Sequence, residues 1–284
     1  MNVPETARFT PDWLALREPA DAAARATDLL VPLRAHLDRA GAAAPSPARP
    51  LVVRDLGCGT GAQARWLAGR LPGPQRWILH DRDPELLARA RAGLPPSLAA
   101  EARRGDITAL TAADLAGTAL VTASALLDLL TFDEVEALAA AVPGAGCPAL
   151  LTLSVVGRVV LHPHDPLDTA IAAAFNDHQR RTEAGRRLLG PDAVAAATAS
   201  FERRGAAVRT SASPWRLGPA QAALTAEWLR GWVGAACEQR PGLPGDDYLR
   251  RRLEQCAAGR LSVVVHHRDL LALPASAPGD GGRA

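Results

Sequence analysis

The sequence predicts an α/β fold: a doubly wound, mostly parallel seven-stranded sheet with an antiparallel last strand, plus an N-terminal helical segment and a lid insertion. Two observations predict it. Short apolar runs alternate with helical patterns from residue 51 onward, which is typical of parallel sheets covered by helices. Three alternate glycines follow the first apolar run, at the position where such sheets bind ligands. The 284 residues suffice for one large buried core.

The expected elements follow one another in order. Strands are expected at residues 51–56, 76–80, 102–105, 120–123, 149–155, 207–210 and 261–266. Helices are expected within 10–39, 61–71, 84–92, 132–141, 191–204 and 215–239. The first helical region begins at Thr10 and Pro11, a typical cap and first-turn pair, and Pro19 is expected to interrupt it.

Five regions of the chain follow from this order. Residues 1–48 are expected to form a helical cap, with a linker rich in alanine and proline at its end, and residues 49–156 the ligand-binding core. Residues 157–190 interrupt the alternation after the fifth strand and are expected to form a lid. Residues 191–274 complete the core, and 275–284 form a disordered tail.

Composition excludes several classes of function. The net charge is +2. The chain contains no lysine, and this excludes lysine Schiff-base chemistry and a phosphate-loop lysine. Its four cysteines form no CxxC pair, which argues against a structural zinc site or a disulfide framework. No signal core or membrane-spanning run is present, so a cytoplasmic location is expected. A nucleic-acid partner is not expected, because no basic stripe is interleaved with aromatic residues.

The stretch LVVRDLGCGTG, residues 51–61, carries the strongest functional signal. A strand leads through Asp55 into Gly57, Gly59 and Gly61, and a helix follows at once. Such a turn lets the backbone approach a ligand closely. The Asp55 carboxylate would repel a pyrophosphate but suits the ammonium group of an amino-acid-like cofactor. The turn therefore points to S-adenosylmethionine and to methyl transfer.

From residue 51 to 155, the chain resembles the class I, Rossmann-like S-adenosylmethionine-dependent methyltransferases. DLGCGTG is similar to the first motif of that family. The resemblance implies that Asp55 contacts the methionine ammonium group. It also implies that the backbone of Gly57 and Gly59 packs under the cofactor, with Gly61 at the entry to the helix.

Three further motifs extend the resemblance. Asp81 in HDRDPELL lies 20 residues after Gly61, the spacing of a ribose-binding carboxylate, while Asp83 is expected to cap the next helix. In RRGDI, the family pattern implies that Asp106 meets the adenine amino group and that Ile107 packs on the ring. In VTASALLDLL, Ser124 is expected to border the transferable methyl group, with Asp128 nearby.

A nicotinamide- or flavin-binding oxidoreductase is the main alternative for this cofactor site. Gly57, Gly59 and Ala62 satisfy GxGxxG/A, and Asp81 suits an NAD ribose equally well. Asp55, the extra Gly61 and the Gly-Asp pair after the third strand weigh against it.

The methyl acceptor is expected to meet the segments outside the core. His162, His164 and His178 in the lid are the candidate catalytic bases, because imidazole titrates near neutrality. The first two, with a nearby aspartate, also suit a divalent cation, although no metal is assigned. Arginines at 180–187 make an anionic small molecule one hypothesis for the acceptor. The adjacent His266 and His267, on opposite faces of the last strand, are assigned no chemistry.

The N-terminal cap offers Trp13, Arg17 and Arg25 as candidates for contact with the substrate or with the methionine carboxylate, beside the simpler interpretation of a packing helix. Methyl transfer to an oxygen or nitrogen atom of a small molecule is the leading prediction. Transfer to carbon, with or without a metal, is the second chemistry. A non-catalytic S-adenosylmethionine-binding scaffold is the alternative of another class.

Overall fold

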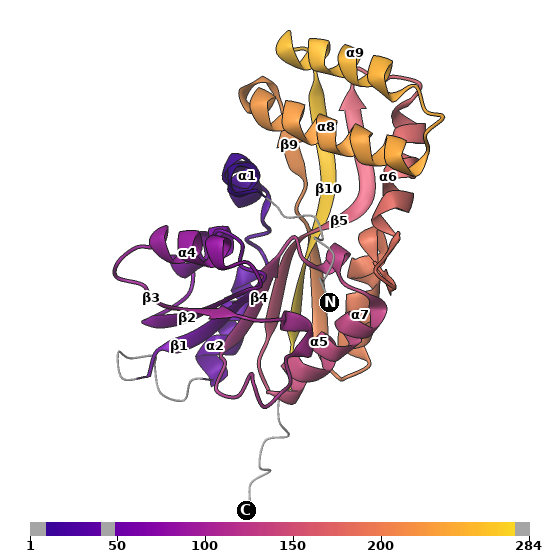
Figure 1. The fold of residues 1–284 in the computed structure, drawn as a ribbon. Coiled ribbons are helices and arrows are strands. Elements are labelled where there is room, and N and C mark those ends of the chain that lie inside the picture. The colour runs from indigo at the N-terminus through magenta and orange to yellow at the C-terminus, as the bar shows by residue number, and fades with distance from the viewer. Residues whose placement is uncertain (1–9, 41–48, 276–284) are drawn as a thin grey trace, which may run out of the picture.

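The structure is a computed structural model that describes residues 10–40 and 49–275. The expected tail and most of the expected linker lie outside these residues. Figure 1 shows one twisted sheet with helices on both faces, and a second group of helices around two strands that continue beyond the sheet. No helix in the described ranges has the length and apolar character needed to cross a membrane.

The central sheet has the order β3-β2-β1-β4-β5-β10-β8, with β9 paired to the far part of β10. Strands β1 to β5 are parallel, whereas β10 is antiparallel to both β5 and β8. The strands are β1 (Leu51–Leu56), β2 (Gln75–Asp81), β3 (Ala99–Arg104), β4 (Leu120–Ser124), β5 (Ala149–His162), β8 (Ala207–Ala212), β9 (Trp215–Leu217) and β10 (Ser262–Leu273). This topology confirms the predicted fold class.

Two apolar clusters fill the faces of the sheet, because adjacent strand residues point to opposite sides. Leu120 and Leu150 join the cluster under α2, α3 and α4, while Val121 and Leu151 join the one under α5 and α7. These helices are α2 (Leu30–Ala40), α3 (Ala62–Ala68), α4 (Pro84–Ala92), α5 (Phe132–Gly144) and α7 (Ala193–Glu202). Asp83 caps α4 through the backbone N–H groups of Glu85 and Leu86, as expected.

A third apolar cluster lies in the upper lobe of Figure 1. Its helices are α6 (Asp168–Gln179), α8 (Ala222–Gln239) and α9 (Gly245–Ala257), and they pack around the far parts of β5 and β10. A short hairpin follows α6 and pairs two strands of two residues each, β6 (Thr182–Glu183) and β7 (Arg186–Arg187). The lobe therefore combines residues 157–190 with the segments around α8 and α9.

The structure corrects two expected elements and adds one helix. Strand β5 continues from residue 155 to His162, because β10 pairs with it along that whole length. Residues Trp215–Leu217 form β9 instead of the start of a helix, because they pair with Val263–Val265 of β10. Helix α9 was not predicted, although its acidic first turn, Asp246 and Asp247, is a typical helix-start signal.

Helix α1 (Pro11–Ala24) continues through Pro19, which was expected to interrupt it. Its start is as predicted, with the Thr10 hydroxyl accepting the backbone N–H of Trp13 at 3.2 Å. Contacts with other elements hold the helix together despite the backbone N–H group that proline lacks: Glu18 pairs with Arg65 of α3, and Asp21 accepts the indole N–H of Trp215. In Figure 1, α1 lies above the upper edge of the sheet.

Candidate functional site

The glycine turn after β1 adopts a backbone that side chains tolerate poorly. Gly57, Gly59 and Gly61 have φ values of +63°, +54° and +84°. A Cβ atom at Gly59 would also lie 3.3 Å from Leu14 Cδ1 of α1. Gly61 is the N-cap of α3, so the turn leads directly from β1 into a helix. The sequence motif thus forms the strand, turn and helix that it predicts.

Asp55 lies at the end of β1 and is fully buried. Neither of its carboxylate oxygens has a hydrogen-bond partner among the described residues. Burial, opposed by the nearby Arg25 and assisted by Asp81, raises the pKa of Asp55 to about 8. A buried carboxylate without a partner is costly, so this position is suited to a cationic group.

Asp81 lies at the end of β2 and holds the glycine turn in place. One carboxylate oxygen accepts the backbone N–H of Gly59 at 2.9 Å, and the other accepts that of Asp83 at 3.0 Å. A carboxylate has about four acceptor positions, so these two bonds leave capacity for hydroxyl groups. The side chain therefore has a structural role that the sequence did not predict.

The other predicted cofactor residues lie along the same edge of the sheet. Asp106 follows β3 and accepts the backbone N–H and the hydroxyl of Thr108, which lower its pKa. Ile107 begins a short 3-10 turn and is half-buried. Ser124 ends β4, and its hydroxyl accepts a hydrogen bond from Arg25 Nη2 at 3.1 Å. The carboxyl ends of four parallel strands thus bring these residues together.

Comparison with protein families gives one match, to a family described as "Methyltransferase domain", over residues 53–143. This part of the chain, about a third of its length, is therefore similar to a methyltransferase domain. The matched range includes the glycine turn and all of the predicted cofactor residues. A comparison with curated protein sequences finds no match.

Several solved structures resemble the chain in fold. The cyclopropane synthase MmaA2 from Mycobacterium tuberculosis is 12% identical with a TM-score of 0.49, and the match covers 93% of this chain and 94% of that one. A putative methyltransferase from Bacillus halodurans is 15% identical with a TM-score of 0.46, covering 87% and 98%. A methyltransferase from Geobacter sulfurreducens, in complex with S-adenosyl-L-homocysteine, is 17% identical with a TM-score of 0.45, covering 93% and 98%.

Two of the three lid histidines, His162 and His164, lie far from the glycine turn. His162 ends β5, ten residues beyond Thr152, the last residue of that strand to pair with β4. At roughly 3.3 Å per residue, this separation is roughly 30 Å along the strand. His164 follows His162, and His178 of α6 lies 3.2 Å from Glu238 of α8. The structure thus separates His162 and His164 from the predicted cofactor residues, and no three metal-ligating side chains cluster among the described residues.

A different histidine lies beside α1. His267 of β10 is buried, and its ring centroid is 5.3 Å from that of Trp215. Its Nδ1 atom has no hydrogen-bond partner among the described residues. Burial lowers the pKa of His267 to about 3, and the nearby Arg17 acts in the same direction. The lowered pKa favours the neutral imidazole. The only sequence signal for its burial was that neighbouring strand residues, His266 and His267, point to opposite faces of the strand.

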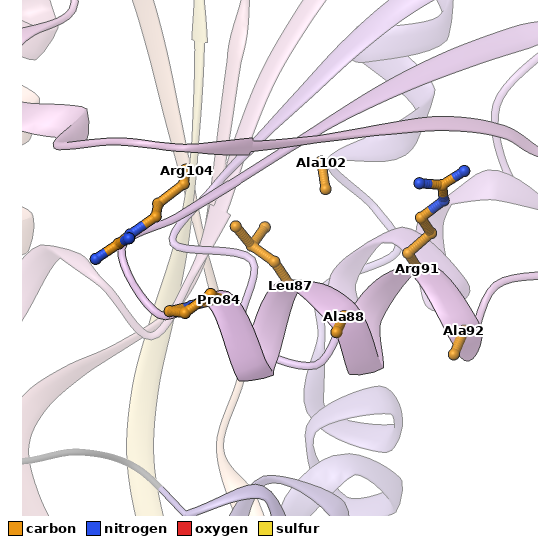
Figure 2. A pocket seen from close by; sticks show the side chains of 7 residues that line it. All are labelled: Pro84, Leu87, Ala88, Arg91, Ala92, Ala102 and Arg104. Carbon is orange, nitrogen blue, oxygen red and sulfur yellow. The ribbon is translucent and has the colours of Figure 1, made fainter.

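A shallow pocket beside the sheet contains none of these residues. It lies between α4 and β3, and Figure 2 shows Arg104 and Arg91 at its two ends. Its lining residues are Pro84, Leu87, Ala88, Arg91, Ala92, Ala102 and Arg104. The predicted cofactor residues instead lie at the carboxyl ends of the parallel strands, where Leu14 of α1 lies against Gly59.

Proposed function

We propose that the protein is an S-adenosylmethionine-dependent methyltransferase that methylates an oxygen or nitrogen atom of a small molecule. One observation carries the choice of cofactor: Asp55, two residues before Gly57, is a fully buried carboxylate without a partner among the described residues. An ammonium group satisfies such a carboxylate, whereas the pyrophosphate of NAD would be repelled by it.

The residues present suit the whole cofactor. Asp55 would hold the ammonium group, and the backbone of Gly57 and Gly59 would lie beneath the ligand. Asp81 retains acceptor capacity for the ribose hydroxyls, and Asp106 and Ile107 would meet the adenine. When bound, S-adenosylmethionine supplies an electrophilic methyl group, whose bond to sulfur breaks as a lone pair of the acceptor binds the carbon.

Helix α1 supplies cover for this site. Leu14 lies against Gly59, and Glu18 forms two hydrogen bonds with Arg65 of α3, at 2.7 and 2.5 Å. Methyl transfer needs alignment of the reacting atoms and exclusion of water. A helix fixed over the glycine turn serves both needs.

We place the proton acceptor at Asp128, in the turn after β4, instead of at the lid histidines. Asp128 is half-buried, and its carboxylate accepts no side-chain hydrogen bond among the described residues. Burial raises its pKa, while Arg17 of α1 opposes the shift. A carboxylate with a raised pKa is a better base for an O–H or N–H group.

The arginines of the lid do not support an anionic acceptor. Arg180 pairs with Asp192, Arg181 with Glu183, and Arg186 with Glu134. These ion pairs satisfy three of the four arginines between residues 180 and 187.

Calorimetric titration separates the cofactor hypotheses. We expect the protein to bind S-adenosylhomocysteine and not NAD, and the reverse result would contradict the proposal. Transfer of a labelled methyl group from S-adenosylmethionine to a mixed panel of alcohols, phenols and amines then tests catalysis. Binding of S-adenosylhomocysteine without transfer to any compound of a broad panel would favour the scaffold alternative.

A further inference from the structure

The side chain of Arg25 is buried with most of its hydrogen-bonding capacity unused. Arg25 directly follows α1, and only 4% of its surface is exposed. Nη2 donates to the Ser124 hydroxyl at 3.1 Å, but Nε and Nη1 have no partner among the described residues. Burial lowers the pKa of Arg25, yet a guanidinium group stays charged in proteins. Buried charges are normally paired, so this cation is suited to an anionic partner.

The carboxylates near Arg25 are, with one exception, already bonded. Asp21 accepts from the Arg17 guanidinium at 2.9 Å and from the Trp215 indole at 2.9 Å. Asp269 accepts two backbone N–H groups and a serine hydroxyl. The exception is Asp55, because neither of its two oxygens has a partner in residues 10–40 or 49–275.

Arg25 and Asp55 influence each other without forming an ion pair. Arg25 donates to Ser124 of β4, and Asp55 pairs with Thr122 of the same strand, so the two charges lie near one another and each shifts the pKa of the other. Within the described part of the chain their side chains form no direct ion pair, since no nitrogen of Arg25 lies within 4.0 Å of an Asp55 oxygen. The site thus combines a buried cation with free donors and a buried anion with free acceptors. A ligand with a carboxylate and an ammonium group on the same carbon atom would satisfy both.

We propose that Arg25 binds the α-carboxylate of the cofactor's amino-acid end, while Asp55 binds its ammonium group. This inference rests on the proposed function and adds the second half of zwitterion recognition. Arginine suits the task, because its planar fork matches a carboxylate.

Three contacts hold Arg25 in position for this role. Its guanidinium lies 5.4 Å from the Trp66 ring centroid, and Ser124 fixes one end of the fork. The backbone N–H of the next residue, Ala26, donates to Asp269 at 2.8 Å. The chain at the end of α1 is thereby attached to β10, so that cofactor binding would also fix α1 over the glycine turn.

A double-mutant cycle between protein and ligand tests the assignment. Calorimetry would measure wild-type protein and Arg25→Gln against S-adenosylhomocysteine and against its decarboxylated analogue, which keeps the ammonium group. We expect loss of the carboxylate to weaken wild-type binding by about 10- to 100-fold, the range for a hydrogen bond to a charged group. Arg25→Gln should weaken S-adenosylhomocysteine by a similar factor. In that variant, the two ligands should bind within about threefold of each other.

Arg70→Gln is the matched control. The Arg70 guanidinium also lies over the Trp66 ring, at 4.7 Å, but its side chain is exposed. We expect this variant to keep the wild-type preference for the carboxylate. Thermal unfolding shows whether Arg25→Gln is folded. If it is not, NMR of the wild-type protein decides: the Nε–H signal of Arg25 should move on binding S-adenosylhomocysteine and stay in place with the decarboxylated analogue.

Three outcomes would overturn the inference. They are equal binding of both ligands by the wild-type protein, an unchanged affinity of Arg25→Gln, and an equal carboxylate effect in both proteins. Each of these can occur while S-adenosylhomocysteine still binds, which leaves the proposed function intact. Absence of any binding by wild-type protein would instead contradict the proposed function, and the assignment of Arg25 with it.

Discussion

Asp269 of β10 accepts a hydrogen bond from the backbone N–H of Ala26 at 2.8 Å and so connects the last strand to the end of the N-terminal helix α1. Its other oxygen accepts the backbone N–H of Leu153 at 2.7 Å and the Ser213 hydroxyl at 2.5 Å. Leu153 has a φ of +58°, which is unusual for a side-chain-bearing residue within a strand. One buried carboxylate therefore holds together the end of α1, a kink in β5 and the turn between β8 and β9.

We expect Asp269→Asn to destabilise the protein by about 1–3 kcal/mol, because an amide nitrogen cannot accept the N–H and O–H groups around it. Urea unfolding of the variant and wild type would measure the change in free energy of unfolding. Ser213→Ala removes only one of the three donors and should cost less. An Asp269→Asn variant as stable as the wild type would show that these bonds do not hold the kink.

The glycine turn should be sensitive to a single added methyl group. Gly59→Ala places a side chain at a φ of +54° and against Leu14, so we expect a loss of about 1–2 kcal/mol from backbone strain alone. Gly69→Ala is the control, since an added Cβ there has no atom within 4 Å and the φ is −71°. Thermal unfolding compares them. Equal stability of the two variants would contradict the strain argument.

The protein should lose stability at low pH, because His80 becomes protonated. Its Nε2 atom lies 3.2 Å from Arg54 Nη1 and accepts that N–H group only when the ring is neutral. Burial and then Arg54 lower the pKa of His80 to about 4, below the value of 6.5 for a free histidine. The unfolded chain therefore binds more protons between these values, so stability is complete above pH 6.5 and falls as the pH approaches 4.

The slope of this loss is up to about 1.4 kcal/mol per pH unit for one proton. Denaturant unfolding at several pH values would show a smaller slope for His80→Gln than for wild type. His164→Gln, at an exposed position, should keep the wild-type slope. A His80→Gln variant with an unchanged slope would place the acid sensitivity elsewhere.

Asp128→Asn should slow methyl transfer while leaving cofactor affinity unchanged. A general base typically contributes about 10²- to 10⁴-fold, so we expect a loss of at least about 100-fold in turnover with an acceptor found in the panel. S-Adenosylhomocysteine titration provides the second measurement. Asp133→Asn, in the exposed first turn of α5, is the control. Wild-type turnover in Asp128→Asn would exclude Asp128 as the proton acceptor.

Local signals made the first half of the fold predictable. The strand at 51–56, the Asp83 cap and the helix at 84–92 depend on residues adjacent in the chain, and each lies where the sequence places it. The glycines predict their own turn because few other residues adopt a positive φ. The residues matched to the family follow the same strands and share one edge of the sheet.

The upper lobe was less predictable, because long-range pairing decides it. β5 continues to His162 only because β10 runs beside it, and this extension carries His162 and His164 away from the glycine turn. Arg25 was one of three candidates on the N-terminal cap. Its burial depends on two contacts between distant parts of the chain. Arg25 bonds to Ser124, 99 residues away, and the adjacent Ala26 bonds to Asp269, 243 residues away. No local pattern encodes such contacts.

The affinity of the Asp55→Asn variant for S-adenosylhomocysteine tests the central claim most directly. The amide keeps the shape of the side chain and removes the charge that would hold the ammonium group. We expect calorimetry to show at least about 10-fold weaker binding than wild type, as for the loss of a charged hydrogen-bond partner. Asp83→Asn, which keeps a capping side chain on α4, should bind as wild type does. Equal affinity of Asp55→Asn and wild type would contradict the account.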